Sequence, residues 1–225
     1  MTSADTNALE AALAEARTRL ARALEALRPK HRGGEMEEWI GANAEVKRLE
    51  RELGAANGDE VAIPYPWEPA WDAGAPMPHV LATNGRVFLV YYVRTPDPDW
   101  DGTYVDVIDP AEARELPLAL VEVKGCYCHR FGGPNDEVFH GHPLAKRGLA
   151  GYGAYTVANS KWIAEHRTIN SVHPMYDPKR WDERQHFFLA FHDDVFECIA
   201  TAFAVEVVHG SFEDALKQVA ARLIR

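Results

Sequence analysis

The sequence has few cysteines, no long apolar run and a shortage of positive charge, and each shortage excludes a class of protein. Three cysteines in 225 residues are an odd number and too few for a disulfide framework, so we expect reduced thiols and a cytoplasmic location. The longest apolar stretches, such as 87–93 and 198–205, are far shorter than the roughly 20 residues that span a bilayer. The first residues also lack the basic and apolar segments of a secretion signal. We therefore expect no membrane association.

Basic side chains are outnumbered, because 24 Lys and Arg against 34 Asp and Glu give a net charge of −10. Nucleic acid is excluded as a partner, since phosphate binding needs a basic stripe that the sequence does not contain. Residues 61–120 concentrate the negative charge, with nine acidic and three basic side chains. This stretch is either a solubilising surface or a docking surface for a basic protein.

What the sequence does contain, 47% hydrophobic and 26% charged residues, is typical of a globular chain. Residues 1–56 predict a helical hairpin, because leucines recur at helical spacing up to Pro29 and a second apolar stripe follows Gly34. We expect the first stripe to pack against the second within one subunit, in a homodimer or with a partner helix. The first stripe is Leu9, Leu13, Leu20, Leu24 and Leu27, and the second includes Met36, Ile40, Leu49 and Leu53.

Residues 57–78 predict a linker that lies against the following domain. This segment is rich in proline and in aromatic residues, namely Pro64, Tyr65, Pro66, Trp67, Pro69, Trp71, Pro76 and Pro78. Proline at this density excludes a helix, and packed indoles are more common than exposed ones. The functional alternative is an aromatic groove for sugars or proline-rich peptides.

Residues 79–225 predict a mainly antiparallel α+β domain. Asn84-Gly85 is typical of a tight turn between a strand at 79–82 and another at 86–94. Residues rich in β-branched and aromatic side chains predict the further strands 103–108, 118–124, 153–157, 185–192 and 195–208. A short internal helix is expected at 161–169, and Ser211 is the expected cap of a C-terminal helix. Strands in runs with helices before and after them favour the α+β class.

Histidines mark the expected functional site, because seven of the ten lie between His129 and His192. Imidazole titrates near neutral pH and also binds metals, so a histidine cluster among carboxylates indicates acid–base or metal chemistry. The candidate acid–base residues are His192, Glu197, Asp136 and His129. Asp136 belongs to a glycine-rich turn at 131–137, which alternatively is a plain surface turn or presents backbone amides to an anion.

The segment 185–200 can be folded as a hairpin with Asp193 and Asp194 in the turn. His192 then pairs with Val195, and His192 becomes the diagonal neighbour of Glu197 on one face of the sheet. Cys198 points to the other face, so we expect a structural thiol there and not a nucleophile activated by His192.

The His140-Gly-His142 pair predicts two metal ligands that project to the same side of an extended chain. His192 is the candidate third ligand, in a centre that resembles three-histidine or two-histidine-carboxylate sites for zinc or iron. Cys126 and Cys128 offer an alternative zinc site with the same two histidines, although the spacing is not that of the common zinc modules.

The sequence thus favours a small enzyme of the hydrolase or lyase type that acts on a small-molecule substrate, with or without a divalent metal. The alternative is a non-catalytic acidic module, similar to an immunity protein or an antitoxin, that recognises a basic protein. The net charge of −10 fits the second interpretation, and the histidine cluster fits the first.

Overall fold

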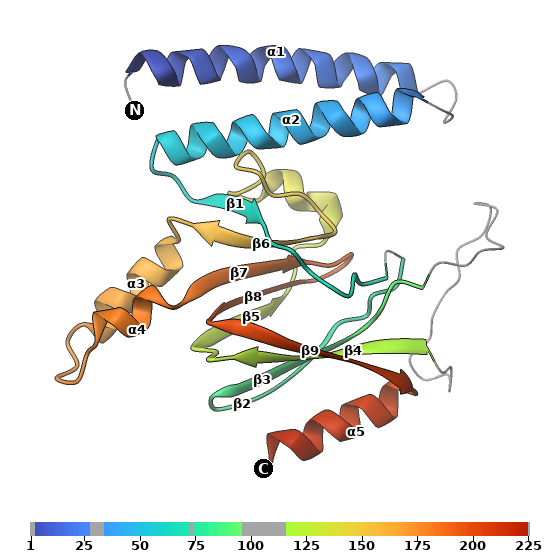
Figure 1. The fold of residues 1–225 in the computed structure, drawn as a ribbon, viewed down its shortest axis with the longest axis vertical. Helices are drawn as coiled ribbons and strands as arrows, with labels where there is room; N and C mark the ends of the chain where they lie inside the picture. The colour runs from blue at the N-terminus through green and yellow to red at the C-terminus, as the bar shows by residue number, and fades with distance from the viewer. Residues whose placement is uncertain (1–2, 28–33, 73, 96–115, 225) are drawn as a thin grey trace. The chain divides into compact units, whose positions relative to one another are not determined.

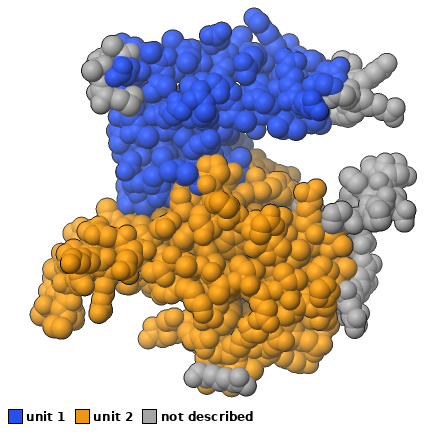
Figure 2. All heavy atoms as spheres, viewed as in Figure 1, with its two compact units in different colours: residues 1–63, 140–150, 157–161 blue, residues 64–139, 151–156, 162–225 orange. Residues whose placement is uncertain are grey.

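The structure, a computed structural model, describes residues 3–27, 34–72, 74–95 and 116–224 (Figure 1). The chain forms two compact units (Figure 2). We call residues 1–63, 140–150 and 157–161 the helical unit, and residues 64–139, 151–156 and 162–225 the sheet unit. The strand expected at 103–108 and seven of the nine acidic side chains of residues 61–120 lie outside the described residues. Among the helices that are described, none is long and apolar enough to cross a membrane.

The helical unit contains the expected hairpin, α1 (Ser3–Leu27) and α2 (Gly34–Ala56). Its core contains Leu13, Ala16, Val46 and Leu49, with Leu20 and Leu53 packed around them. The inward positions of α1 repeat at intervals of three and four residues, through Ala23 and Leu27, and the alanines let the two helices approach closely.

Part of the expected leucine stripe was wrong. Leu24, Met36 and Ile40 are exposed, with 45%, 39% and 54% of their surface in contact with solvent. Leu24 directly follows the inward-facing Ala23, so the helix turns it away from the seam. The expected stripe therefore included Leu24 where the smaller Ala23 holds the inward position.

Glu50 carries a buried charge inside the helical unit, where only 5% of it is exposed. Its two carboxylate oxygens accept hydrogen bonds from Arg17 Nη2 and Lys47 Nζ, both at 3.1 Å. Lys47 Nζ also donates to the carbonyl of Ala145 at 2.7 Å. These contacts tie α2 to the 140–150 segment, and they compensate the cost of burying the carboxylate.

One sheet of the sheet unit has the strand order β2-β3-β4-β9 and is antiparallel throughout. Its strands are β2 (His79–Thr83), β3 (Arg86–Tyr92), β4 (Leu116–Lys124) and β9 (Ala202–Gly210). The expected turn is confirmed, because Thr83 pairs with Arg86 and Gly85 has a φ of 90°. Helix α5 (Phe212–Leu223) packs on this sheet through Phe212 and Val219, and Ser211 caps it as expected.

The second sheet contributes β6 (Gly153–Ala158), β7 (Gln185–Ala190), β8 (Val195–Ala200) and β5 (Cys128–Gly132) to the sheet unit, in that order. Its inner face meets the inner face of the first sheet in one aromatic core, the intersheet core. This core includes Leu89, Tyr91, Val121, Phe187, Leu189, Phe191, Phe196 and Cys198. Strand β5 and the short strand β1 (Val61–Pro64) were not foreseen from the sequence.

The single strand expected at 195–208 is two strands, β8 and β9, in different sheets. The chain changes sheets at Thr201, whose backbone N–H and Oγ1 both donate to the carbonyl of Lys124 at 3.0 Å. Gly125 lies against this corner with a φ of 59°, and a Cβ there would be 2.7 Å from Thr201 Oγ1. A continuous apolar pattern does not reveal such a corner, because both strands keep the same period of two.

Three short helices are also described: α3 (Lys161–Asn170), as expected, α4 (Pro178–Asp182) and the 3₁₀ helix η1 (Asp136–Gly141). The proline-rich segment lies against its domain, also as expected. Trp71 is buried in the intersheet core, and Trp67 Nε1 donates to the hydroxyl of Tyr91 at 3.0 Å.

The hairpin core makes a direct prediction about stability. Leu13→Ala should lower the free energy of unfolding by about 2–5 kcal/mol, because it leaves a cavity in a packed seam. Leu24→Ala, the matched control on the same helix, should cost less than about 1 kcal/mol, because Leu24 is exposed. Urea denaturation of both variants measures the difference, and equal losses would contradict the observed seam.

Candidate functional site

The hairpin of β7 and β8 positions the candidate acid–base residues, and its turn is one residue earlier than expected. Phe191 N–H donates to the carbonyl of Asp194 at 3.0 Å, so His192 and Asp193 form the turn. The predicted pairing of His192 with Val195 was therefore wrong, because Val195 pairs with Ala190. Moving the turn by one residue moves the register by two, so each side chain keeps the face that was expected. Cys198 indeed faces the intersheet core.

Because of this register, Glu197 has a different histidine partner. Phe188 lies opposite Glu197, which makes His186 its diagonal neighbour and moves His192 away from it. His186 Nε2 is 2.9 Å from Glu197 Oε2, and both side chains are buried. The expected contact between His192 and Glu197 was wrong, but the expected face of Glu197 is confirmed.

Arg130 completes this group on the edge strand β5, directly opposite Glu197. Arg130 Nη2 donates to Glu197 Oε2 at 2.6 Å, and the guanidinium lies over the ring of Trp162, 4.6 Å from its centroid. Trp162 also contacts the ring of His186 edge to face, at 5.1 Å. We call Arg130, Trp162, His186 and Glu197 the carboxylate cluster.

Charge pairing determines the ionisation of the carboxylate cluster. Burial alone would raise the pKa of Glu197, but the hydrogen bonds from His186 and Arg130 outweigh burial and hold this pKa below its ordinary value. Glu197 is therefore ionised at neutral pH and is a poor general base. The cluster has the properties of a structural ion pair that fixes β5 and α3 on the sheet.

His192 belongs to a second group, which we call the turn cluster: His192, Asp193, Asp136 and Tyr152. His192 Nδ1 is 2.9 Å from Asp193 Oδ1, and the His192 carbonyl accepts a hydrogen bond from the backbone N–H of Asp136 at 3.1 Å. The Tyr152 ring meets the His192 ring edge to face at 5.7 Å, and the Tyr152 hydroxyl donates to the Asp136 carboxylate. The structure thus brings together two of the expected catalytic residues, His192 and Asp136.

The electrostatics of the turn cluster suit proton transfer. The hydrogen bond with Asp193, and further the charges of Asp136 and Glu137, raise the pKa of His192. The His192 side chain is 37% exposed, so a substrate can reach it. Desolvation, together with the bond to Asp136, raises the pKa of Tyr152 to about 12, so its hydroxyl keeps its proton and acts as a donor.

A cavity of about 260 Å³ adjoins the turn cluster inside the sheet unit. The proline-rich segment, the end of β3 and the start of β6 form its walls. The lining residues are Tyr65, Trp67, Ala70, Trp71, Arg94, Tyr152, Gly153 and Ala154. Tyr152 belongs to both features, with a left-handed φ of 58° that a non-glycine residue seldom adopts.

The remaining candidate residues are not gathered into either cluster. His129 stacks on Phe196 at 6.0 Å, and burial lowers its pKa, so it is a neutral packing residue. His140 and His142 belong to the helical unit, whereas His192 belongs to the sheet unit. Within the described part of the chain, no group of three or more His, Cys, Asp or Glu side chains is arranged to hold a metal ion.

The three cysteines are unsuited to nucleophilic or thiolate chemistry. Burial raises the pKa of Cys126 to about 11, and it also raises the pKa of Cys128 and of the fully buried Cys198. Thiols that keep their protons are weak nucleophiles, and among the described residues Cys126 and Cys128 belong to no group of three or more His, Cys, Asp or Glu that could hold a metal ion. The structure therefore gives no support to an active cysteine or to a zinc site at Cys126 and Cys128.

The carboxylate cluster should contribute to stability in a pH-dependent way. Glu197→Gln removes the charge that Arg130 and His186 share, so we expect a loss of about 3 kcal/mol at pH 7. The folded state lowers the pKa of Glu197 below its ordinary value of 4.5. The ionised carboxylate therefore contributes fully to the free energy of unfolding above pH 4.5, and this contribution is lost as pH falls through the folded-state pKa. The difference in the free energy of unfolding between Glu197→Gln and the unchanged protein should therefore decrease as pH falls, which urea denaturation at several pH values measures.

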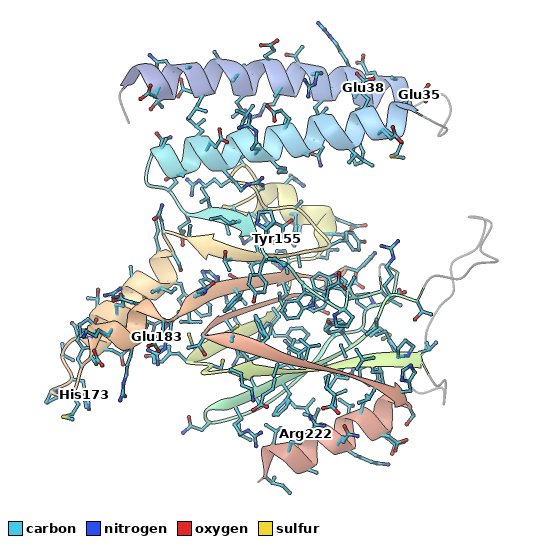
Figure 3. All side chains as sticks on the ribbon, in the orientation of Figure 1. Glu35, Glu38, Tyr155, His173, Glu183 and Arg222 are labelled. Atoms are coloured by element: carbon cyan, nitrogen blue, oxygen red, sulfur yellow. The ribbon has the colours of Figure 1, made fainter. Side chains whose placement is uncertain are left out.

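The matched control for that measurement is Glu183→Gln, at an exposed glutamate just beyond α4 (Figure 3). Glu183→Gln should change the free energy of unfolding by less than about 0.5 kcal/mol at every pH. A Glu197→Gln variant as stable as this control would show that the cluster has no structural role.

Comparison with known proteins gave no match: no protein-family model, no curated protein and no solved structure is similar to this chain. No function is therefore carried over from a relative. What the chain does must follow from its own side chains, above all from His192 and Tyr152 beside the aromatic cavity.

Proposed function

We propose that the sheet unit is a small-molecule enzyme of the hydrolase or lyase type, with His192 as its acid–base residue and the aromatic cavity as its substrate site. The observation that carries the proposal is the position of Tyr152. Its side chain lines the cavity, contacts the His192 ring and donates to Asp136. Tyr152 therefore connects the cavity to a solvent-accessible histidine that is oriented by a carboxylate.

The roles of the residues follow from their hydrogen bonds. Asp193 engages Nδ1 of His192, which leaves Nε2 as the nitrogen that exchanges a proton with the substrate. A carboxylate in this position fixes the orientation of the ring and stabilises its protonated form. Tyr152 donates its hydroxyl proton to Asp136, so its role is to position Asp136 next to the His192 ring. A histidine held by a carboxylate can transfer a proton to or from a substrate, as general acid–base catalysis of hydrolysis or elimination requires.

The glycine-rich turn 131–137 fixes the position of Asp136. Asp136 is the first residue of η1, and its backbone N–H is fixed by the His192 carbonyl at 3.1 Å. Gly151 lies beside it, since a Cβ at Gly151 would be 3.4 Å from Asp136 Cβ. The turn therefore positions Asp136 for Tyr152, which is a more specific role than the surface turn considered from the sequence.

The proposal is tested by comparing variants on a complex substrate mixture. The purified protein is incubated with a bacterial metabolite extract, and consumption is followed by mass spectrometry. His192→Asn should slow consumption by about 100-fold or more, as expected for the loss of a general acid–base group. His173→Asn is the control, because His173 is exposed at the tip of the loop after α3 (Figure 3). No consumption by the unchanged protein, or equal consumption by His192→Asn, would refute the proposal.

The ionisation of His192 offers an independent measurement. Asp193 raises the pKa of His192, so Asp193→Asn should lower this pKa, and the pH dependence of any activity should move toward acid by the same amount. Titration of the His192 ring protons by NMR measures the shift without a substrate. An unchanged pKa in Asp193→Asn would show that this hydrogen bond does not control the proton on His192.

A further inference from the structure

Aromatic residues form much of the cavity wall, and several of their polar groups are hydrogen-bonded within the protein. Trp67 Nε1 donates to the Tyr91 hydroxyl at 3.0 Å, and that hydroxyl donates to the Pro69 carbonyl at 2.8 Å. The Tyr152 hydroxyl is engaged by Asp136. These polar groups are therefore used inside the protein, and the indole and phenol faces remain for a ligand.

The aromatic wall is rigid because its rings support one another. The ring centroid of Trp67 is 6.3 Å from that of Trp71 and 4.7 Å from that of Phe203. The ring centroid of Trp71 is in turn 4.6 Å from that of Phe191 in the intersheet core. Backbone bonds hold the same segment on the end of β3, since Trp71 and Val93 form a β-bridge. A preformed wall of this kind binds a flat ring at little cost in conformational entropy.

Arg94 is the one residue with a formal charge among the described residues that line the cavity. Its backbone is fixed, because Arg94 N–H donates to the Ala70 carbonyl at 2.9 Å. Its side chain is exposed, so the guanidinium is accessible to a ligand. An arginine next to aromatic walls selects a planar anion, because its fork of N–H donors matches a carboxylate.

We infer that the cavity binds a small aromatic carboxylate, with its ring against Trp67 and Trp71 and its carboxylate on Arg94. That this ligand is also the substrate rests on the proposed function of His192. The volume of about 260 Å³ is below the roughly 300–1,000 Å³ of sites for drug-sized ligands, which favours a single ring. A sugar of that size would need several wall atoms to bind its hydroxyls, and the wall polar groups described above are already engaged.

Binding of benzoate and of its neutral isostere benzamide to the full chain tests the inference. Titration calorimetry should show benzoate binding at least about tenfold more tightly than benzamide. Arg94→Gln should weaken the binding of benzoate by at least about tenfold and leave the binding of benzamide unchanged. Arg180→Gln, at an arginine of α4 that is 81% exposed, is the matched control and should change neither.

A second variant tests the location of the ligand. Ala70→Leu adds volume at a lining residue whose own side chain is exposed, so it should abolish benzoate binding while the melting temperature stays unchanged. Benzamide binding as tightly as benzoate, no binding of either probe, or benzoate binding that survives both Arg94→Gln and Ala70→Leu would overturn the inference.

The His192→Asn variant separates this inference from the proposed function. His192 does not line the cavity, so His192→Asn should bind benzoate as the unchanged protein does. If benzoate binding depends on Arg94 but the protein consumes no metabolite, the proposed function fails and the ligand class stands. If His192-dependent consumption is found but benzoate does not bind, the ligand class fails and the proposed function stands.

Discussion

The intersheet core is the constraint on which the rest of the sheet unit depends. Two antiparallel sheets share this core, and the rings of Tyr91, Phe187, Phe191 and Phe196 fill it. Burial of large aromatic side chains is the main favourable term in such a fold. The proline-rich segment inserts Trp71 into the same core, so the wall of the cavity is anchored by the interaction that holds the sheets together. The shape of the cavity thus depends on core packing.

The two histidines of the β7–β8 hairpin have different roles because one is buried and the other is exposed. His186 lies under Trp162 with a buried carboxylate, where no substrate reaches it, whereas His192 lies at the turn with an exposed carboxylate. A buried ion pair is costly to form and costly to break, so loss of one partner of the carboxylate cluster destabilises the fold by more than the intact pair stabilises it. The same two residue types at the turn remain free to exchange protons with solvent and ligand.

Much of the fold could be predicted from the sequence, because the α+β class, the helical hairpin, the Asn84-Gly85 turn and the Ser211 cap depend on local patterns. The face of Cys198 followed from the period of two. The partner of Glu197 did not, because the register depends on which two residues of 191–194 form the turn. Arg130, Trp162 and the cavity were not foreseen, since they depend on strands and loops distant in sequence; an arginine two residues after Cys128 gave no signal of its own.

The crossing at Thr201 has a consequence for the order of folding. The β7–β8 hairpin closes through a two-residue turn, whereas β9 pairs with β4 across a long stretch of chain, with Ala202 opposite Lys124 and Gly210 opposite Leu116. Local contacts form before distant ones, because closing a long loop costs more entropy. We therefore expect the turn that carries His192 to form early, and the pairing of β9 with β4 and the corner at Thr201 to form later.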